Sequence, residues 1–284
     1  MFATASLARR IESADAGLIR TIAGAAAPRV PKDDIVVCEM HGGVAAYVEP
    51  GSPYNKAAGF GFGGVPPAEE MDALEAQFSA RNAPLQFEVS SLADPALVKM
   101  LTTRGYALVA FENVLGIAVE SGARAQALPP GVRITKTSEA DAQVWMDTMA
   151  DAFMTPDVYD GPASQESIPR DVLTRIFGDA VAAGFDRFVA WRGESVAGAA
   201  TFRTQDRVAQ FCGAATMPAH RRQGVQSALL RHRLNEAARL GCDVGVVTTT
   251  PGSTSQANVQ KAGFSLLYVR ANLVLEPGAR ADRV

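Results

Sequence analysis

Two stretches of the chain end in the same order of sequence signals, and this feature restricts the fold more than any other. Residues 85–120 predict a strand, a helix that begins at Asp94, a glycine followed by an aromatic residue, and a long β-rich stretch. Residues 243–275 predict the same series, with Gly263 before the aromatic residue. Glycine suits the position after a helix, and an aromatic residue suits the start of the next strand. We therefore expect an internal duplication, with chance similarity between two α/β endings as the alternative.

A linker is expected between the two halves at residues 121–131, which read SGARAQALPPG. The segment is rich in small and polar residues and ends in a Pro-Pro-Gly turn signal. The 284 residues are enough for two cores. We therefore expect two tandem domains, residues 1–120 and residues 132–284. The expected fold class is α/β (α+β), with a mixed, largely antiparallel sheet flanked by helices in each domain.

The second half predicts an antiparallel meander followed by a helix. Three short strands are expected at 186–191, 197–203 and 208–217, and tight turns separate them. A helix then begins near Arg222 and ends before Gly241.

Composition and charge exclude several functions. The net charge of −3 and the pI near 5.7 argue against nucleic acid as the main partner. No apolar run is long enough to span a membrane, and the first residues lack the features of a signal peptide. The three cysteines and three histidines show no spacing typical of a disulfide or metal site. We expect a cytoplasmic protein that binds neither a metal, nor nucleic acid, nor a membrane.

The loop before the helix at Arg222 has the features of an anion site. Free backbone N–H groups and the helix dipole favour an anion at a helix start. Gly224 allows close approach of the backbone, and Arg221 and Arg222 add positive charge. No carboxylate occurs between Ala219 and Asn235. The alternative is an ordinary strand–loop–helix connection with solvated arginines.

The segment that carries this loop resembles the acetyl-CoA signature of the GNAT superfamily of N-acetyltransferases. Residues 216–230 read TMPAHRRQGVQSALL. Arg221 and Gly224 match the family pattern R/Q-x-x-G-x-G/A, and Gln226 stands where the family has Gly or Ala. The likeness spans about residues 132–276 and implies the fold of that family, with two tandem GNAT-like domains. The first of these is expected to be a degenerate repeat without a cofactor loop.

The resemblance implies that acetyl-CoA binds as a co-substrate in the second half. The main chain from Gly213 to Thr216 is expected to pair with the pantetheine amides as an added strand. A nearby N–H is expected to polarise the thioester carbonyl. Asn258 is expected to reach the pantetheine arm, with an exposed helix residue as the alternative. The full set of expected cofactor-binding residues is Ala214, Ala215, Thr216, Arg221, Arg222, Gln223, Gly224, Val225, Gln226, Ser227 and Asn258.

The resemblance leaves the proton donor open. Many GNAT enzymes use a tyrosine at the position that Val259 occupies here, and valine cannot donate a proton. The donor is therefore expected elsewhere, with Ser255 among the nearest hydroxyls, or CoA leaves as the thiolate. Asp151 and Glu166 are expected to act as the base or to bind the amine, so the expected catalytic residues are Asp151, Glu166 and Ser255. Further acidic and tyrosine side chains, Asp157 and Tyr159, lie in the same expected acceptor region. For each of these residues the alternative is a solvated loop residue or, for the serine, a helix cap.

A second glycine-rich segment occurs at residues 59–64, which read GFGFGG. Pro66 and Pro67 remove N–H donors from the following helix start, and acidic residues follow at once. We expect a packing or substrate-cleft role for it and no phosphate site.

The sequence thus predicts an enzyme, an N-acyltransferase that moves an acetyl group from acetyl-CoA to a primary amine by direct attack in a ternary complex. The partner is a small-molecule or peptide amine, which the sequence does not identify, and a homodimer is allowed. One alternative is a non-catalytic acyl-CoA-binding or regulatory protein. Another is a nucleotide-binding protein that uses residues 59–64.

Overall fold

The computed structural model describes residues 1–120, 128–155 and 168–278. The contacts divide the chain into two compact units. The N-terminal unit contains Phe2–Val114 together with the chain from Leu266 onward, and the C-terminal unit contains Leu115–Ser265 with Met1. Among the described residues, no helix is both long and apolar enough to cross a membrane.

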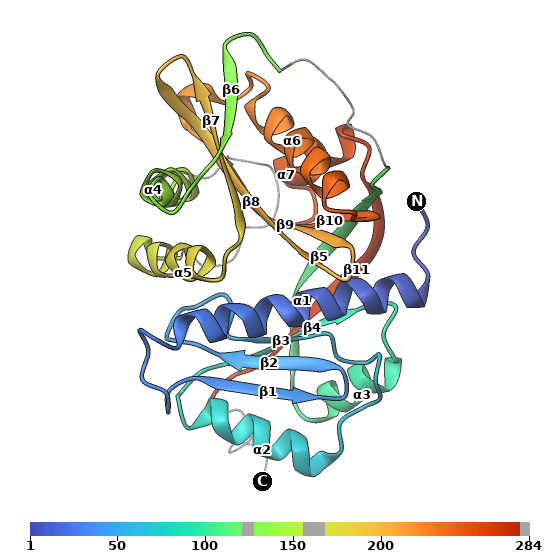
Figure 1. Cartoon of the computed structure of the whole chain (residues 1–284). Helices are drawn as coiled ribbons and strands as arrows, with labels where there is room; N and C mark the ends of the chain where they lie inside the picture. Colours follow the sequence, from blue (N-terminus) through green and yellow to red (C-terminus); the bar gives the residue numbers. More distant parts are fainter. Residues whose placement is uncertain (121–127, 156–167, 279–284) are drawn as a thin grey trace. The chain divides into compact units, whose positions relative to one another are not determined.

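The N-terminal unit is a mixed sheet with helices on both faces (Figure 1). Its strand order is β1-β2-β3-β4-β11-β5, with β3 and β4 parallel and the pairs β1–β2, β2–β3 and β4–β11 antiparallel. Because side chains alternate along a strand, α1 packs against Val44 and Ala46 while α2 packs over Ala45 and Tyr47 on the other face. The elements are α1 Ala5–Ala26, β1 Val36–Met40, β2 Gly43–Tyr47, β3 Lys56–Ala58, α2 Ala68–Ser79, β4 Leu85–Ser90, α3 Pro95–Thr103, β5 Ala107–Ala118 and β11 Ser265–Leu275.

The C-terminal unit contains the predicted meander and helix. The strand order is β5-β10-β9-β8-β7-β6, antiparallel from β6 to β9 and parallel between β9 and β10. Trp145 of α4 donates from Nε1 to the Ala200 carbonyl at 3.1 Å, and α6 packs into the core around Phe202 and Phe211. The elements are β6 Val132–Lys136, α4 Ala142–Phe153, α5 Arg170–Ala182, β7 Asp186–Arg192, β8 Ser195–Gln205, β9 Val208–Thr216, the short 3-10 helix η1 Pro218–His220, α6 Val225–Arg239, β10 Val244–Thr249 and α7 Thr254–Lys261. The predicted fold class is confirmed.

The repeated ending is present in both halves as β4-α3-β5 and β10-α7-β11. Gly105 and Gly263 follow the two helices with φ of 98° and 95°. The Tyr106 N–H donates to the Leu101 carbonyl, and the Gly105 N–H donates to the Thr102 carbonyl. The same pair of bonds closes α7, and together they satisfy carbonyls at the end of each helix. The glycine signals therefore predicted both helix ends correctly.

The last strand, β11, belongs to the N-terminal unit from Leu266 onward. Strand β11 pairs antiparallel with β4, with Asn272 opposite Glu88, and lies between β4 and β5. Strand β5, which begins in the N-terminal unit, ends beside β10 in the other. The expected division at residues 121–131 does not anticipate this exchange, because the sequence signals of a strand do not specify the strand with which it pairs. Residues 121–127 of the linker lie outside the described residues, and the proposed domain division stays a prediction.

Candidate functional site

Strand β9 carries a β-bulge in the middle of its pairing with β8. Thr201 lies opposite Gly213, but the next pair is Arg203 opposite Gln210, so β9 has one residue more than β8 between these two pairs. A bulge bends a strand and increases its twist.

Strands β9 and β10 part at the bulge. They are paired in parallel only from Val208–Gln210 with Val244–Val246. Beyond Gln210 no further residue pair joins them in the described part of the chain, although β9 runs to Thr216 and β10 to Thr249. On its other side β9 stays paired with β8 as far as Thr216. One edge of β9, which is half-buried from Cys212 to Thr216, can therefore accept an extended ligand as an added strand.

Two unpaired hydroxyl groups lie at the ends of these parting strands. Thr216 Oγ1 and Thr249 Oγ1 are both buried, and neither has a hydrogen-bond partner among the described residues. Buried polar groups without a partner are rare in native proteins, and a bound ligand is one explanation. Each hydroxyl is therefore a candidate contact for a polar group of a ligand.

The loop that leads into α6 has the backbone of an anion site. Arg222 and Gly224 both have left-handed backbones, with φ of 60° and 79°. Gly224 is the N-cap of α6, and no side chain caps the helix. The first N–H groups of the helix, from Val225 to Ser227, have no acceptor within the helix. With the helix dipole, this start favours a diphosphate.

The two arginines of the loop differ. Arg221 is half-buried, donates from Nε to the Thr216 carbonyl at 3.3 Å, and donates from Nη2 to the Thr155 carbonyl. Arg222 is exposed. Gln223 is exposed and donates to the Ala219 carbonyl at 3.1 Å. Arg221 thus ties the loop to the end of β9, and Arg222 is the cation that is open to a ligand.

Two of the predicted cofactor residues contact each other directly. Asn258 Nδ2 on α7 donates to Gln226 Oε1 on α6 at 2.7 Å. Both side chains are half-buried. The residue that departs from the family pattern is therefore the hydrogen-bond partner of the residue predicted to reach the pantetheine arm.

In the described part of the chain, the predicted catalytic residues make no hydrogen bond with one another. Asp151 is exposed at the end of α4, and Arg170 Nη2 donates to it at 2.8 Å. Ser255 is exposed on α7, whereas Ser253 caps that helix by accepting from the Gln256 N–H at 3.2 Å. Glu166 lies outside the described residues, as do Asp157 and Tyr159. No catalytic role is assigned by this geometry.

Val259 points into the core and has 4% of its surface exposed. It packs in the same cluster as Phe211 and Phe264. The position at which the resemblance places a tyrosine is thus apolar and enclosed.

Sequence reasoning missed two residues of this region, Thr249 and Arg233. Arg233 is buried on α6, between Leu229 and Ala237 on the apolar face. A charged residue at the helical spacing of a core face was the available signal.

The glycine-rich segment of the N-terminal unit is packed against its own unit. A Cβ on Gly59 would lie 2.9 Å from that of Ala16, and the Gly61 carbonyl accepts the Asp94 N–H at 2.9 Å. Helix α2 begins after Pro67, with acidic residues in its first turn. These contacts agree with the packing role expected for the segment.

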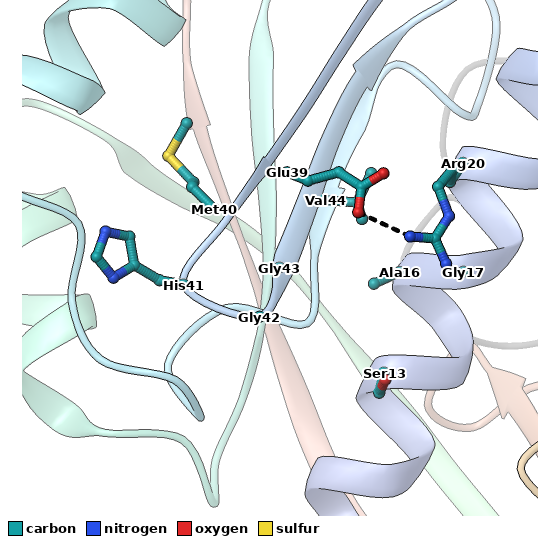
Figure 2. Close-up of a pocket in the computed structure, with 10 residues that line it drawn as sticks. All are labelled: Ser13, Ala16, Gly17, Arg20, Glu39, Met40, His41, Gly42, Gly43 and Val44. Carbon is teal, nitrogen blue, oxygen red and sulfur yellow. Dashed lines mark hydrogen bonds and ion pairs between the residues drawn. The ribbon is translucent and has the colours of Figure 1, made fainter.

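A cavity of about 280 Å³ lies in the N-terminal unit between α1 and the turn that joins β1 to β2 (Figure 2). Arg20 and Glu39 form an ion pair of 2.7 Å at its wall, and both are about half exposed. None of the predicted cofactor residues lines this cavity.

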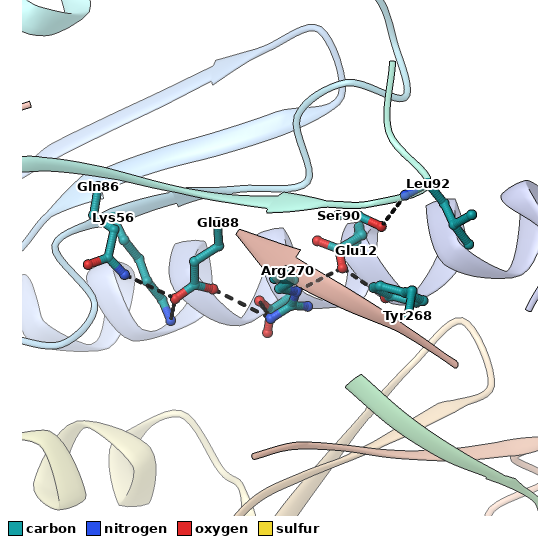
Figure 3. A network of polar contacts seen from close by, with 9 residues as sticks. Glu12, Lys56, Gln86, Glu88, Ser90, Leu92, Tyr268 and Arg270 are labelled. Atoms are coloured by element: carbon teal, nitrogen blue, oxygen red, sulfur yellow. Dashed lines mark hydrogen bonds and ion pairs between the residues drawn. The ribbon is translucent and has the colours of Figure 1, made fainter. Parts of the chain in front are cut away.

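A network of buried charges connects α1, β3, β4 and β11 of the N-terminal unit (Figure 3). Arg270 lies 2.8 Å from Glu12, 2.9 Å from Asp15 and 3.4 Å from Glu88. Lys56 is 2.7 Å from Glu88. Burial raises the pKa of Glu12 although Arg270 opposes this, and burial with the charge of Glu88 raises the pKa of the nearby Glu112 to about 7. In the described ranges no group of acidic, histidine or cysteine side chains could hold a metal ion.

Comparisons with known proteins give one family match and several similar folds. Residues 149–264 match the model of the acetyltransferase (GNAT) family. A GCN5-related N-acetyltransferase from Kribbella flavida is 18% identical, with 93% of this chain and 95% of that chain covered and a TM-score of 0.63. One from Sphaerobacter thermophilus is 15% identical, with 82% and 72% covered and a TM-score of 0.56.

A tandem GNAT protein from the clavulanic acid biosynthesis pathway is similar over most of its length. It is 13% identical, with 91% of this chain and 88% of that chain covered and a TM-score of 0.58. No curated protein matches the sequence. The resemblance seen at residues 216–230 is confirmed by these matches, and the structural likeness concerns the fold.

Proposed function

We propose that this chain, which carries an acetyltransferase domain of the GNAT family in residues 149–264, transfers an acetyl group from acetyl-CoA to a primary amine of a small molecule or peptide. The observation that carries the proposal is the parting of β9 and β10 beside the start of α6. No side chain caps this helix, and its N-cap residue, Gly224, has a left-handed backbone conformation. An extended chain that ends in a diphosphate needs both features, an open strand edge and an anion site, next to each other along the chain.

The cofactor is proposed to bind in three contacts. The pantetheine amides pair with the main chain at Ala214, Ala215 and Thr216, and the diphosphate binds the loop from Arg221 to Ser227. Asn258 turns from Gln226 to the pantetheine arm, a change that replaces one neutral hydrogen bond by another and costs little. A metal has no role in this proposal.

The reaction is proposed as a direct attack in a ternary complex. A base takes one proton from the ammonium group, and the amine nitrogen then attacks the thioester carbonyl carbon. The C–N bond forms as the C–S bond breaks, and the nitrogen gives up its second proton to the base or to solvent. CoA leaves as a thiolate or takes a proton as it leaves. An amine of this kind has a pKa near 10.4, so a base is needed at neutral pH. Asp151 and Glu166 are the proposed bases and Ser255 is the proposed donor, whereas Val259 can supply no proton.

A second function, acyl-CoA binding without catalysis, is favoured by two observations. Val259 is buried and apolar, and Gln226 holds Asn258 in a contact within the protein. Release of free CoA thiol from acetyl-CoA on addition of amines, amino acids or peptides separates the two functions. Tight binding with no thiol release above the rate without protein would favour the binding protein.

The test of the proposed cofactor site is a charge reversal at Arg222. A hydrogen bond to a charged group contributes about 1.5–3 kcal/mol, so Arg222→Glu should weaken acetyl-CoA binding by about tenfold to a hundredfold. Arg192→Glu is the matched control, because Arg192 is also exposed in the C-terminal unit but lies at the end of β7. Calorimetry on the folded proteins measures the affinities. Equal affinity of both variants, or no binding by the wild type, would refute the proposed site.

A further inference from the structure

Arg233 is a buried cation whose partners in the described part of the chain are main-chain carbonyls. It lies on α6 with 3% of its surface exposed. Nη1 donates to the carbonyls of Thr201 at 2.9 Å and Gly213 at 3.1 Å, and Nε donates to Leu229 at 3.3 Å. Its guanidinium carbon lies 4.9 Å from the centre of the Phe211 ring.

This arrangement is unfavourable for the charge itself. Burying a cation without a carboxylate is unfavourable, because the cation loses its hydration. Burial lowers the pKa of Arg233 to about 10, which still leaves the group charged at neutral pH. An apolar side chain of similar length would fill the same space without this cost. Packing alone therefore does not explain why an arginine occupies this position.

The contacts of Arg233 coincide with the bulge of β9. Thr201 and Gly213 form the first pair after the bulge, and Phe211 lies within it. Gln210, the residue before the bulge, is also the last residue of β9 that pairs with β10. One guanidinium nitrogen of Arg233 therefore bonds a carbonyl of β8 and a carbonyl of β9, at the position where β9 leaves β10.

We propose that Arg233 is a positioning residue that holds the β9 bulge and thereby keeps the edge of β9 from Ala214 to Thr216 open for the pantetheine arm. This inference rests on the proposed function, because it concerns the same cofactor. Arg233 contacts no reacting atom in this account and acts only through the shape of β9. A lysine can bond one or two of the three carbonyls, whereas a methionine can bond none.

Arg187 provides a matched control for the loss of a buried arginine. It lies on β7 of the same unit with 6% of its surface exposed, and its Nη1 donates to the Phe185 carbonyl at 3.0 Å. Burial lowers its pKa as well. A purely structural role for Arg233 would make substitutions at the two positions equivalent.

The experiment compares Arg233→Met, Arg233→Lys and Arg187→Met with the wild type by calorimetry with acetyl-CoA and by thermal unfolding. We expect Arg233→Met to weaken acetyl-CoA binding at least tenfold, Arg233→Lys to weaken it about three- to tenfold because lysine keeps only part of the hydrogen bonds, and Arg187→Met to change the affinity less than threefold. If Arg233→Met does not fold, the comparison of Arg233→Lys with Arg187→Lys decides, with a loss expected only in the former.

Two results would overturn the inference. Wild-type affinity in a folded Arg233→Met protein, or equal losses at Arg233 and Arg187, would remove the positioning role and leave the proposed function intact. Absence of acetyl-CoA binding by the wild type would refute the proposed function, and the inference with it.

Discussion

Replacement of Arg270 by methionine should destabilise the N-terminal unit more than the same replacement of an exposed arginine. Arg270 stands on the exchanged strand β11 with 2% of its surface exposed and contacts Glu12, Asp15 and Glu88. Methionine keeps the length and most of the packing of the side chain but removes the charge and its donors. The carboxylates then stay buried, with Lys56 as the remaining cation of the network in Figure 3.

The size of the expected loss of stability follows from the burial of the carboxylates that Arg270 contacts. Removing one member of a buried ion pair costs about 3–5 kcal/mol, because the other member keeps its desolvation penalty. An exposed pair such as Arg20 with Glu39 contributes about 0–1 kcal/mol. Arg20→Met is therefore the matched control in the same unit.

The loss of stability in Arg270→Met should increase with pH. Burial already raises the pKa of Glu12 above its value in the unfolded chain, and Arg270 acts against this rise. Without Arg270 the pKa of Glu12 rises further. A carboxyl group whose pKa is raised on folding gives stability that is present below its unfolded pKa and is lost as the pH rises through its folded pKa. The variant should therefore be closest to the wild type near pH 5 and furthest from it near pH 8.

The assay uses the distribution of tryptophan between the units. Both tryptophans, Trp145 and Trp191, lie in the C-terminal unit, so their fluorescence reports that unit, whereas far-UV circular dichroism reports both. In urea, Arg270→Met should lose part of its dichroism before the fluorescence changes. Coincident transitions with wild-type midpoints at pH 8 would refute the reasoning, as would a loss no larger than that of Arg20→Met.

Two further predictions concern the apolar helix position and the exchanged strands. Val259→Ala should cost about 1–3 kcal/mol of stability through a small cavity but lower turnover by less than tenfold, whereas removal of a general acid lowers turnover about 100- to 10,000-fold. Turnover is measured as steady-state thiol release by the folded variant, and a complete loss of turnover with intact acetyl-CoA affinity would contradict the prediction. Residues 128–284 alone should expose apolar surface and be poorly soluble, because β11 loses its partner β4 and β10 loses its neighbour β5; a monodisperse and fully active fragment in size-exclusion chromatography would contradict this.

The sequence by itself determined the local elements and the backbone of the loop before α6. The turns of the meander, the glycines after α3 and α7, and the left-handed Gly224 before α6 depend on signals a few residues long. Such signals act on φ, ψ and nearby hydrogen bonds, so they can be interpreted without knowledge of the partner strands. The family signature belongs to the same class, because strand, loop and helix are consecutive in the chain.

Contacts between distant residues were decided only by the tertiary structure. Gln226 and Asn258 are separate signals in the sequence and one hydrogen bond in the structure. Arg221 matches the cofactor pattern, but its side chain binds the carbonyls of Thr216 and Thr155. The catalytic residues stay predictions, because Asp151 and Ser255 are exposed and Glu166 lies outside the described residues.

Strand β11 shows the physical reason most clearly. Tyr268, Arg270 and Asn272 alternate along it and would be assigned to a solvent-facing side by their polarity. All three are buried, because β11 pairs with β4 and Glu12 of α1 accepts hydrogen bonds from Tyr268 and Arg270. A strand's polarity pattern fixes which side chains share a face, whereas the partner that covers that face is set by the rest of the chain.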